Sequence, residues 1–280
     1  MKITKKIIAV ILFIVFAFGC FSLTASANSG LNYLVLGDSI GVGQGLLNPT
    51  EACYGKVVAD TNGYKYKNYA VGGYTTGNLL GYMEVDFVDE AIREADIISL
   101  SIGGNDFLMD MGSLAFSPWA FGDYSKFDEI ADKFYDNFSK IVKRIRSINP
   151  DVVLLVQNLY NPRFDLLRDM FQEGVNRLNA GYSKYLKNHP GSFYIVDVAS
   201  AFAGNKDLIC IDSVHPSAEG NLLIAKLTLK KLYALGLGSS TTPIVKNEGI
   251  DIGFISPIEA INLVECYYAL AVKYILILLA

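Results

Sequence analysis

Five short stretches rich in β-branched and aromatic residues recur along the chain, and helical periodicity follows them. They cover residues 33–36, 67–71, 97–102, 152–157 and 193–198. Apolar residues then recur every three or four positions across 127–145 and 167–185, as on amphipathic helices. Strands such as 152–157 are almost continuously apolar, which is typical of parallel strands buried on both faces. The pattern predicts an α/β domain of three layers, α/β/α, around a central parallel sheet of about five strands.

Polar and glycine-rich segments follow the first three predicted strands. Ser39 lies in a Gly-Asp-Ser segment after the first, Gly73 in a Gly-Gly turn after the second, and Asn105 in a Gly-Gly-Asn-Asp segment after the third. In open parallel sheets, sites form beyond the carboxyl ends of the strands. A serine hydroxyl there could act as a nucleophile, and backbone amides with an Asn carboxamide could stabilise an oxyanion.

A base for that serine stands before the last predicted helix, which is expected to begin near Ser217. Asp212 and His215 are three residues apart, so both side chains can face one cavity. The carboxylate can hold one imidazole nitrogen and leave the other free to accept the serine proton. The chain has only two histidines, and the other, His189, lies in an Asn-His-Pro-Gly turn. The residues therefore predict acyl transfer by an activated serine.

Together these segments resemble the SGNH family of GDSL-type esterases and lipases. The resemblance implies a flavodoxin-like fold and the hydrolysis of carboxylic esters without a metal or cofactor. It implies a catalytic triad of Ser39, His215 and Asp212. It also implies an oxyanion hole made by the amides of Ser39 and Gly73 and by the side chain of Asn105.

The resemblance covers about residues 32–235 and departs from the family pattern in small ways. Ile40 stands where the family usually has Leu, and Gly72 is an alternative to Gly73 as the oxyanion glycine. An insert between Phe107 and Tyr135, with its aromatic residues from Phe107 to Tyr124, is expected either to border the acyl pocket or act as a lid, or to pack on the core. Residues 163–168 are expected to form the opposite rim of that pocket.

The N-terminus has the features of a secretory signal. Three lysines precede the apolar run 7–18, and Ala25-Ser26-Ala27 supplies a small-x-small cleavage motif. We expect residues 1–27 to be a signal peptide cleaved after Ala27, with lipoprotein processing at Cys20 as the alternative. The protein is then secreted or associated with the cell surface. Residues 28–237 are expected to form the hydrolase domain.

Residues 238–280 are expected to be a linker and an apolar tail of unknown role. The apolar part, 267–280, is shorter than the roughly 20 residues of a membrane helix. A peripheral helix on a membrane surface, a folded-back helix and a membrane anchor therefore all stay open. The net charge of -4 argues against nucleic acid as a partner, because phosphate binding needs clustered Lys and Arg. A small-molecule or lipid ester is the expected partner.

Three functions are compatible with these observations. The first is an exported esterase or lipase, and the second is a deacetylase of O-acetylated cell-wall or plant glycans, which would use the same chemistry. The third is a cell-surface binding protein with an inactive hydrolase fold. A binding module has no need of Ser39, Asn105, Asp212 and His215 together, which favours the enzymes.

Overall fold

The computed structural model describes residues 29–109 and 123–255 and single positions of the tail, namely 260, 261, 264, 267, 268, 271, 272 and 275. The predicted signal peptide and most of the aromatic insert lie outside the described residues. The strands are β1 (Asn32–Gly37), β2 (Lys65–Asn68), β3 (Ile97–Ser101), β4 (Val153–Gln157) and β5 (Tyr194–Val196). The helices are α2 (Ser39–Val42), α3 (Pro49–Ala52), α4 (Tyr54–Asn62), α5 (Thr76–Tyr82), α6 (Asp86–Glu94), α7 (Gly104–Leu108), α10 (Ser125–Ile148), α11 (Arg168–Asn188), α12 (Val198–Phe202), η1 (Lys206–Leu208) and α13 (Ala218–Ala234).

The five strands form one sheet in the order β2-β1-β3-β4-β5, and every neighbouring pair is parallel. The predicted parallel sheet is therefore confirmed. The predicted second strand, 67–71, lay too far toward the C-terminus, because β2 spans Lys65–Asn68. The strand ends where the Asn68 side chain accepts a hydrogen bond from the amide of Ala70 at 3.1 Å, a local turn that competes with strand pairing.

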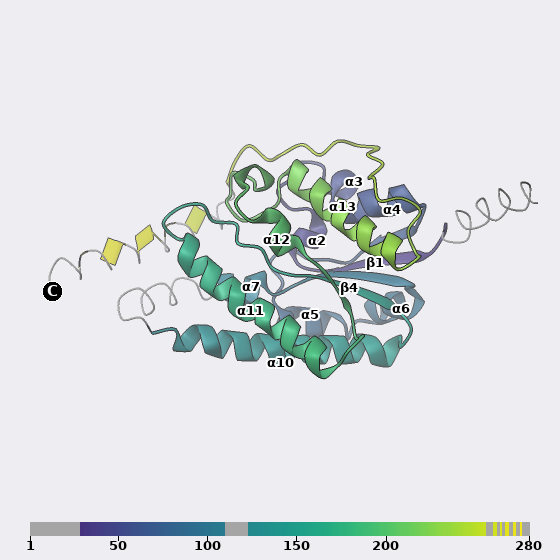
Figure 1. Cartoon of the computed structure of the whole chain (residues 1–280), viewed down its shortest axis with the longest axis horizontal. Helices are drawn as coiled ribbons and strands as arrows, with labels where there is room; N and C mark the ends of the chain where they lie inside the picture. The colour runs from purple at the N-terminus through teal and green to yellow at the C-terminus, as the bar shows by residue number, and fades with distance from the viewer. Residues whose placement is uncertain are drawn as a thin grey trace, which may run out of the picture.

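Successive side chains of each strand point to opposite faces of the sheet and pack into two separate apolar cores. Leu34 and Leu36 point to a core shared with α5, α6, α7, α10 and α11. Tyr33 and Val35 point to the other core, shared with α4, α12 and α13. Figure 1 shows these two helix layers below and above the sheet. The three-layer α/β/α architecture thus follows from strands that bury both of their faces.

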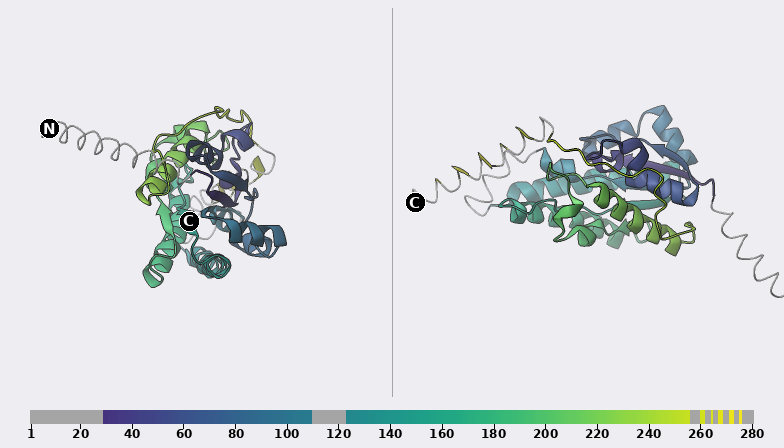
Figure 2. Two further views of the ribbon diagram at one scale, coloured as in Figure 1. Left: turned by 90° about the vertical axis from the view of Figure 1, so that its right-hand side faces the viewer. Right: turned by 90° about the horizontal axis from the view of Figure 1, so that it is seen from above.

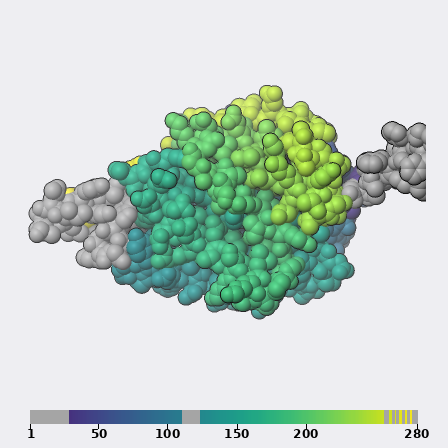
Figure 3. Space-filling view, in the orientation of Figure 1, coloured from purple at the N-terminus to yellow at the C-terminus, as the bar shows by residue number. Residues whose placement is uncertain are grey.

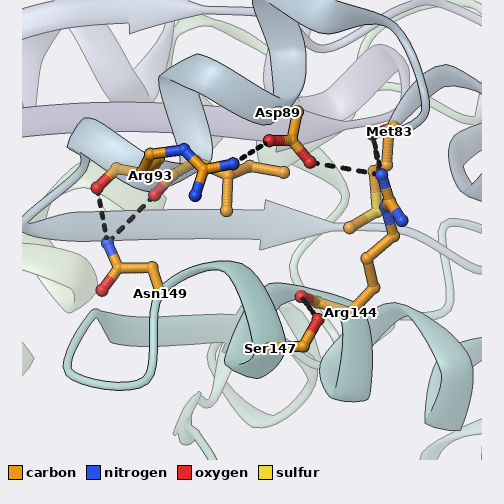
Figure 4. Close-up of polar contacts among 7 residues, drawn as sticks. Met83, Asp89, Arg93, Arg144, Ser147 and Asn149 are labelled. Carbon is orange, nitrogen blue, oxygen red and sulfur yellow. Dashed lines mark hydrogen bonds and ion pairs between the residues drawn. The ribbon is translucent and has the colours of Figure 1, made fainter.

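Polar contacts fix α10 against the end of α5 and against α6 in the lower layer (Figure 4). The Arg144 guanidinium donates to the Met83 carbonyl at 3.1 Å and to Asp89 Oδ1 at 3.2 Å. The Asn149 side chain donates to the Ala95 carbonyl at 2.8 Å, beyond the last turn of α6. The bonds to the Met83 and Ala95 carbonyls satisfy backbone acceptors that a helix end leaves without intrahelical partners.

Residues 238–253, here called the C-terminal strap, lie against the domain as an extended segment. In Figure 1 this yellow-green segment passes over α13, and the right-hand view of Figure 2 shows it from above. The Ser239 amide donates to Asn62 Oδ1 at 2.8 Å, and the Ile244 amide donates to Thr61 Oγ1 at 2.9 Å. The region expected to be a linker is thus bonded to α4, and it covers the upper edge of the surface in Figure 3.

The far end of the strap pairs with the loop that follows α2. The Leu47 amide donates to the Ile250 carbonyl, and the Ile252 amide donates to the Gly45 carbonyl, both at 2.8 Å. These are backbone bonds between segments about two hundred residues apart in sequence. The strap therefore pairs with a loop that follows the short helix beginning at Ser39.

The tail beyond the strap is described at few positions. Among these, Tyr267 donates a hydrogen bond to Asp165 at 2.8 Å, which places one point of the tail beside the loop after β4. Within the part of the chain that the structure describes, no helix combines the length and apolarity that a membrane span requires.

Candidate active site

The sharp turn between β1 and α2 presents Ser39. Gly37 has a φ of +123°, and a Cβ placed on it would lie 1.8 Å from the Ser101 carbonyl oxygen, so only glycine fits. Asp38 caps α2, because its Oδ1 accepts from the Ile40 amide at 3.1 Å. Ser39 is then the first residue of the helix and is buried except for its pocket-facing surface.

A strained loop presents His215. Ser213 has a φ of +58°, the left-handed region that residues other than glycine seldom adopt. Asp212 Oδ1 holds this turn by accepting from the amides of Val214 and His215, both at 2.9 Å. The Cys210 amide donates to the His215 carbonyl at 2.8 Å and fixes the other side of the loop. Such strain persists only where the surroundings over-determine the conformation, and it concentrates at functional sites.

The structure brings Ser39, His215 and Asp212 into one hydrogen-bonded chain. Ser39 Oγ lies 2.9 Å from His215 Nε2, and His215 Nδ1 lies 2.7 Å from Asp212 Oδ2. The imidazole and the carboxylate are both about 95% buried. A neutral imidazole in this position donates its Nδ1 proton to the carboxylate, which leaves Nε2 as the acceptor for the serine hydroxyl.

The C-terminal strap also reaches the helix behind His215. Ser217 caps α13 as predicted, because its Oγ accepts from the Gly220 amide at 3.1 Å. Asp251 Oδ1 accepts from the Ala218 amide at 2.6 Å, which satisfies another free donor of the same helix end. The strap therefore joins the loop after Ser39 to the helix after His215.

Asn105 faces the same hollow as Ser39. Its Nδ2 donates to the Tyr74 carbonyl at 3.0 Å, which fixes the direction of the carboxamide. Gly73 immediately precedes Tyr74 and has a φ of +79°. Gly72 lies on the other side of that turn, where an added Cβ would come 3.0 Å from the Gln44 side chain. The turn after β2 thus lies between the loop after α2 and Asn105.

Two carboxylates beside the site, the buried Asp38 and the partly buried Asp106, accept hydrogen bonds from neighbouring turns. Asp38 also accepts from Ser101 Oγ at 3.1 Å. Burial raises the pKa of Asp38 from 3.8 to about 7, against the opposing effect of its hydrogen bonds. Asp106 accepts from the amide of Thr76 at 2.8 Å and from its hydroxyl, and burial raises the pKa of Asp106 as well.

An apolar pocket opens at Ser39 and has a cavity volume of about 70 Å³. Phe107, at the start of the aromatic insert, lines the pocket and also belongs to the core shared with α10 and α11, so it fits both expected alternatives. The remaining lining was not predicted and comes from the loop after β4, from α11 and from the His215 loop, as Leu159, Tyr160, Pro162, Phe171, Val175, Leu178 and Val214. The periodicity of α11 contained the signal, since Phe171, Val175 and Leu178 belong to its apolar stripe. Such a lining suits the apolar chain of an acyl group.

A parallel three-layer fold with a serine, an imidazole and a carboxylate joined at the carboxyl end of the sheet defines a class of ester hydrolase. Sequence comparison gives the family: residues 35–223 match the GDSL-like lipase/acylhydrolase family, and the chain belongs to it. The chain is similar to the spore germination lipase LipC of Bacillus licheniformis, with 31% identity over 219 residues. That match spans 74% of this chain and 97% of LipC. The protein is a carboxylic ester hydrolase.

Solved structures have the same fold. A lipase from a goat rumen metagenome, Lip_vut3, superposes with a TM-score of 0.60 at 26% identity, over 75% of this chain and 99% of that one. The acetylxylan esterase Axe2 of Geobacillus stearothermophilus superposes with a TM-score of 0.54 at 19% identity, over 77% of this chain and 97% of that one. The implied SGNH hydrolase fold is thereby confirmed.

Proposed function

We propose that the protein is an exported serine esterase that cleaves carboxylic esters through an acyl-enzyme. The observation that carries the proposal is the chain of hydrogen bonds from Ser39 through His215 to Asp212, with its serine end open to the apolar pocket. In acyl transfer, a serine needs a base within hydrogen-bond reach and a third group that orients the base. The two distances of 2.9 and 2.7 Å meet both requirements.

The reaction then follows in two halves. Ser39 Oγ attacks the acyl carbon while His215 Nε2 takes its proton, and Asp212 stabilises the resulting imidazolium. The bond from the acyl carbon to the alcohol breaks, and His215 returns the proton to the departing alkoxide. A water molecule next attacks the acyl-enzyme with His215 again as base, and the acid leaves as Ser39 regains its proton.

The developing oxyanion needs donors that are already oriented. Asn105 supports this role because one of its amide protons is directed to the Tyr74 carbonyl, and the second stays available to the pocket that it lines. The amides of Ser39 and Gly73 complete the proposed oxyanion hole. The positive φ of Gly73 supports glycine at that position, since a turn of this shape strains any other residue.

Covalent labelling tests the proposed nucleophile. A fluorophosphonate probe should label the folded wild type and should fail to label Ser39→Ala. Hydrolysis of a chromogenic ester series from acetyl to palmitoyl should then show a preference for acyl chains of several carbons, because the pocket is apolar. Activity that survives His215→Ala would refute the assignment of the base, and absent labelling of the wild type would favour an inactive fold.

We also propose secretion or attachment at the cell surface, on the basis of the leader-like residues 1–27. Sequencing of the N-terminus of protein collected outside the producing cell tests this. A mature chain beginning after Ala27 is the expected result, and a lipid-modified Cys20 would establish the lipoprotein alternative. Deacetylation of glycans stays the second candidate function, because a second hollow, lined by Asn161, Gln172 and Asn176 among others, shares Leu159 and Val175 with the pocket.

A further inference from the structure

The end of the C-terminal strap is bonded along the loop that follows α2. Residues 248–252 of the strap run beside residues 45–48, here called the serine loop. In addition to the two backbone bonds between these segments, the Asn48 side chain accepts from the Ile250 amide at 3.1 Å and donates to the Glu248 carbonyl at 2.8 Å. The match to the hydrolase family ends at residue 223, so the strap lies outside the part of the chain that defines the family.

The serine loop lies directly against residues 210–216, here called the base loop, which carry His215. Gly45 has a φ of +104°, and a Cβ placed on it would lie 3.1 Å from His215 Cβ and 2.8 Å from Cys210 Sγ. No side chain fits between the two loops, so the Gly45 backbone packs against the residue that bears the imidazole. Because such packing leaves no slack, a displacement of the serine loop either moves His215 or opens a gap beside it.

The buried Cys210 side chain fills the junction between the two loops. Its Sγ lies 3.4 Å from the Gly45 carbonyl oxygen and 3.3 Å from the Pro216 carbonyl oxygen. Its amide donates to the His215 carbonyl at 2.8 Å. The Gly45 carbonyl also accepts from the strap amide of Ile252. The strap, the serine loop and the base loop therefore meet at one carbonyl group.

Asp251 bonds to both sides of this junction. Its backbone pairs with Leu46 in an antiparallel bridge, and its Oδ1 accepts from the Ala218 amide at 2.6 Å. Gly249 lets the strap approach closely, because a Cβ placed there would lie 2.9 Å from the Ala218 Cβ. Ala218 begins α13, three residues after His215. One strap residue thus ties the serine loop to the helix that follows the base loop.

We propose that Asp251 is a positioning residue of the esterase, through which the strap holds His215 in register with Ser39. The nucleophile and its base lie 176 residues apart in sequence, and the turn at Ser213 before the base is strained. Such a turn keeps its conformation only while its surroundings hold it, and a misplacement of about 1 Å can lower a rate about 10²-fold. The inference rests on the proposed function, in which His215 is the base.

Steady-state kinetics test the assignment. Asp251→Ala should lower kcat for a chromogenic butyrate ester about tenfold with little change in KM, because the base is misplaced while the acyl pocket is kept. Asp251→Asn keeps an oxygen acceptor for the Ala218 amide and should recover most of the rate. Recovery by the conservative variant separates the hydrogen bond from the charge of the carboxylate.

Thr61→Val is the matched control for a weakened strap. Thr61 Oγ1 accepts from the strap amide of Ile244 at 2.9 Å, at the end of the strap that is bonded to α4. The variant therefore also removes one side-chain acceptor from a backbone amide, but at a distance from the junction of the loops, and kcat should stay unchanged. Equal losses of kcat in Thr61→Val and Asp251→Ala, or no loss in either, would overturn the proposal.

Nuclear magnetic resonance of the imidazoles tests the positioning without a substrate. The chain has only two histidines, and His189→Gln assigns their signals. The Nδ1 proton that His215 shares with Asp212 should exchange with solvent about tenfold faster in Asp251→Ala, because local opening becomes easier. The same increase is expected when Ser39 is also changed to alanine. Unchanged exchange would overturn the positioning role.

Failure of the proposed function gives a different result. A wild type that hydrolyses no ester and takes up no fluorophosphonate at Ser39, but shows the faster proton exchange in Asp251→Ala, would refute the esterase. The role of Asp251 in holding the imidazole would then stand by itself.

Discussion

The buried carboxyl of Asp38 predicts how stability depends on pH. Burial raises its pKa from 3.8 to about 7 in the folded protein, while the unfolded chain keeps an ordinary aspartate. Between these two values the folded state binds the proton and the unfolded state does not. The free energy of unfolding therefore falls as pH rises from about 4 to about 7, and it levels off above that. The full difference in pKa corresponds to about 4 kcal/mol.

Asp38→Asn removes this titration and keeps the acceptor for Ile40 and Ser101. We expect the variant to gain stability relative to the wild type as pH rises, by about 3 kcal/mol between pH 5 and pH 8. Urea unfolding at a series of pH values, followed by circular dichroism, measures the difference. Asp136→Asn, at an exposed carboxylate of α10, controls for the removal of one negative charge.

The test measures how the difference in stability between Asp38→Asn and the wild type changes with pH, and not the absolute stability of either protein. A substitution in a tight turn can cost stability by itself, but that cost is the same at every pH. A constant difference between Asp38→Asn and the wild type from pH 5 to pH 8 would refute the argument that Asp38 is buried with a raised pKa.

Three further predictions concern the loops around the site. Asn105→Ala should lower kcat about 10²–10³-fold in steady-state assays with little change in thermal stability, because it removes one proposed oxyanion donor; unchanged kcat would remove Asn105 from the mechanism. Ser213→Val should lower the free energy of unfolding by about 1–2 kcal/mol, because a β-branched residue resists the left-handed conformation, whereas Ser213→Gly should be tolerated. Equal effects of the two substitutions in urea unfolding would show that the turn is not strained. Asp251→Ala should lower the free energy of unfolding by about 1 kcal/mol through the lost contact with the Ala218 amide, and Asp251→Asn should recover part of this loss. Urea unfolding of the two variants checks this, and equal losses would show that the hydrogen bond does not stabilise the protein.

Much of the fold could be predicted because its signals are strong and periodic. The apolar residues at 127–145 and 167–185 predicted α10 and α11, which span Ser125–Ile148 and Arg168–Asn188. The cap at Ser217 marked the start of α13. These elements bury one continuous stripe, so a spacing rule is enough to find them. The end of β2 was misplaced because the Asn68 side chain, and not hydrophobicity, ends the strand.

The meeting of Ser39, Asp212 and His215 was expected from the carboxyl-end rule and from the family resemblance, but its local geometry was not. The left-handed Ser213 carries no sequence signal, because the conformation is imposed by the two amides that Asp212 accepts. Likewise, the strap reads as a linker because its composition is polar and rich in small residues. Its pairing with residues 45–47 uses backbone atoms, which every residue has, so no side-chain pattern in the sequence predicts this pairing.

The position of the strap in the chain has a consequence for the order of assembly. Ile250 and Ile252 are translated about two hundred residues after Gly45 and Leu47, so the loop that follows α2 emerges from the ribosome without its backbone partners. Contacts between such distant positions form slowly, because a long loop must close before they gain any energy. The pairing of the strap with residues 45–47 would then follow formation of the sheet, whose last strand, β5, is translated before the strap.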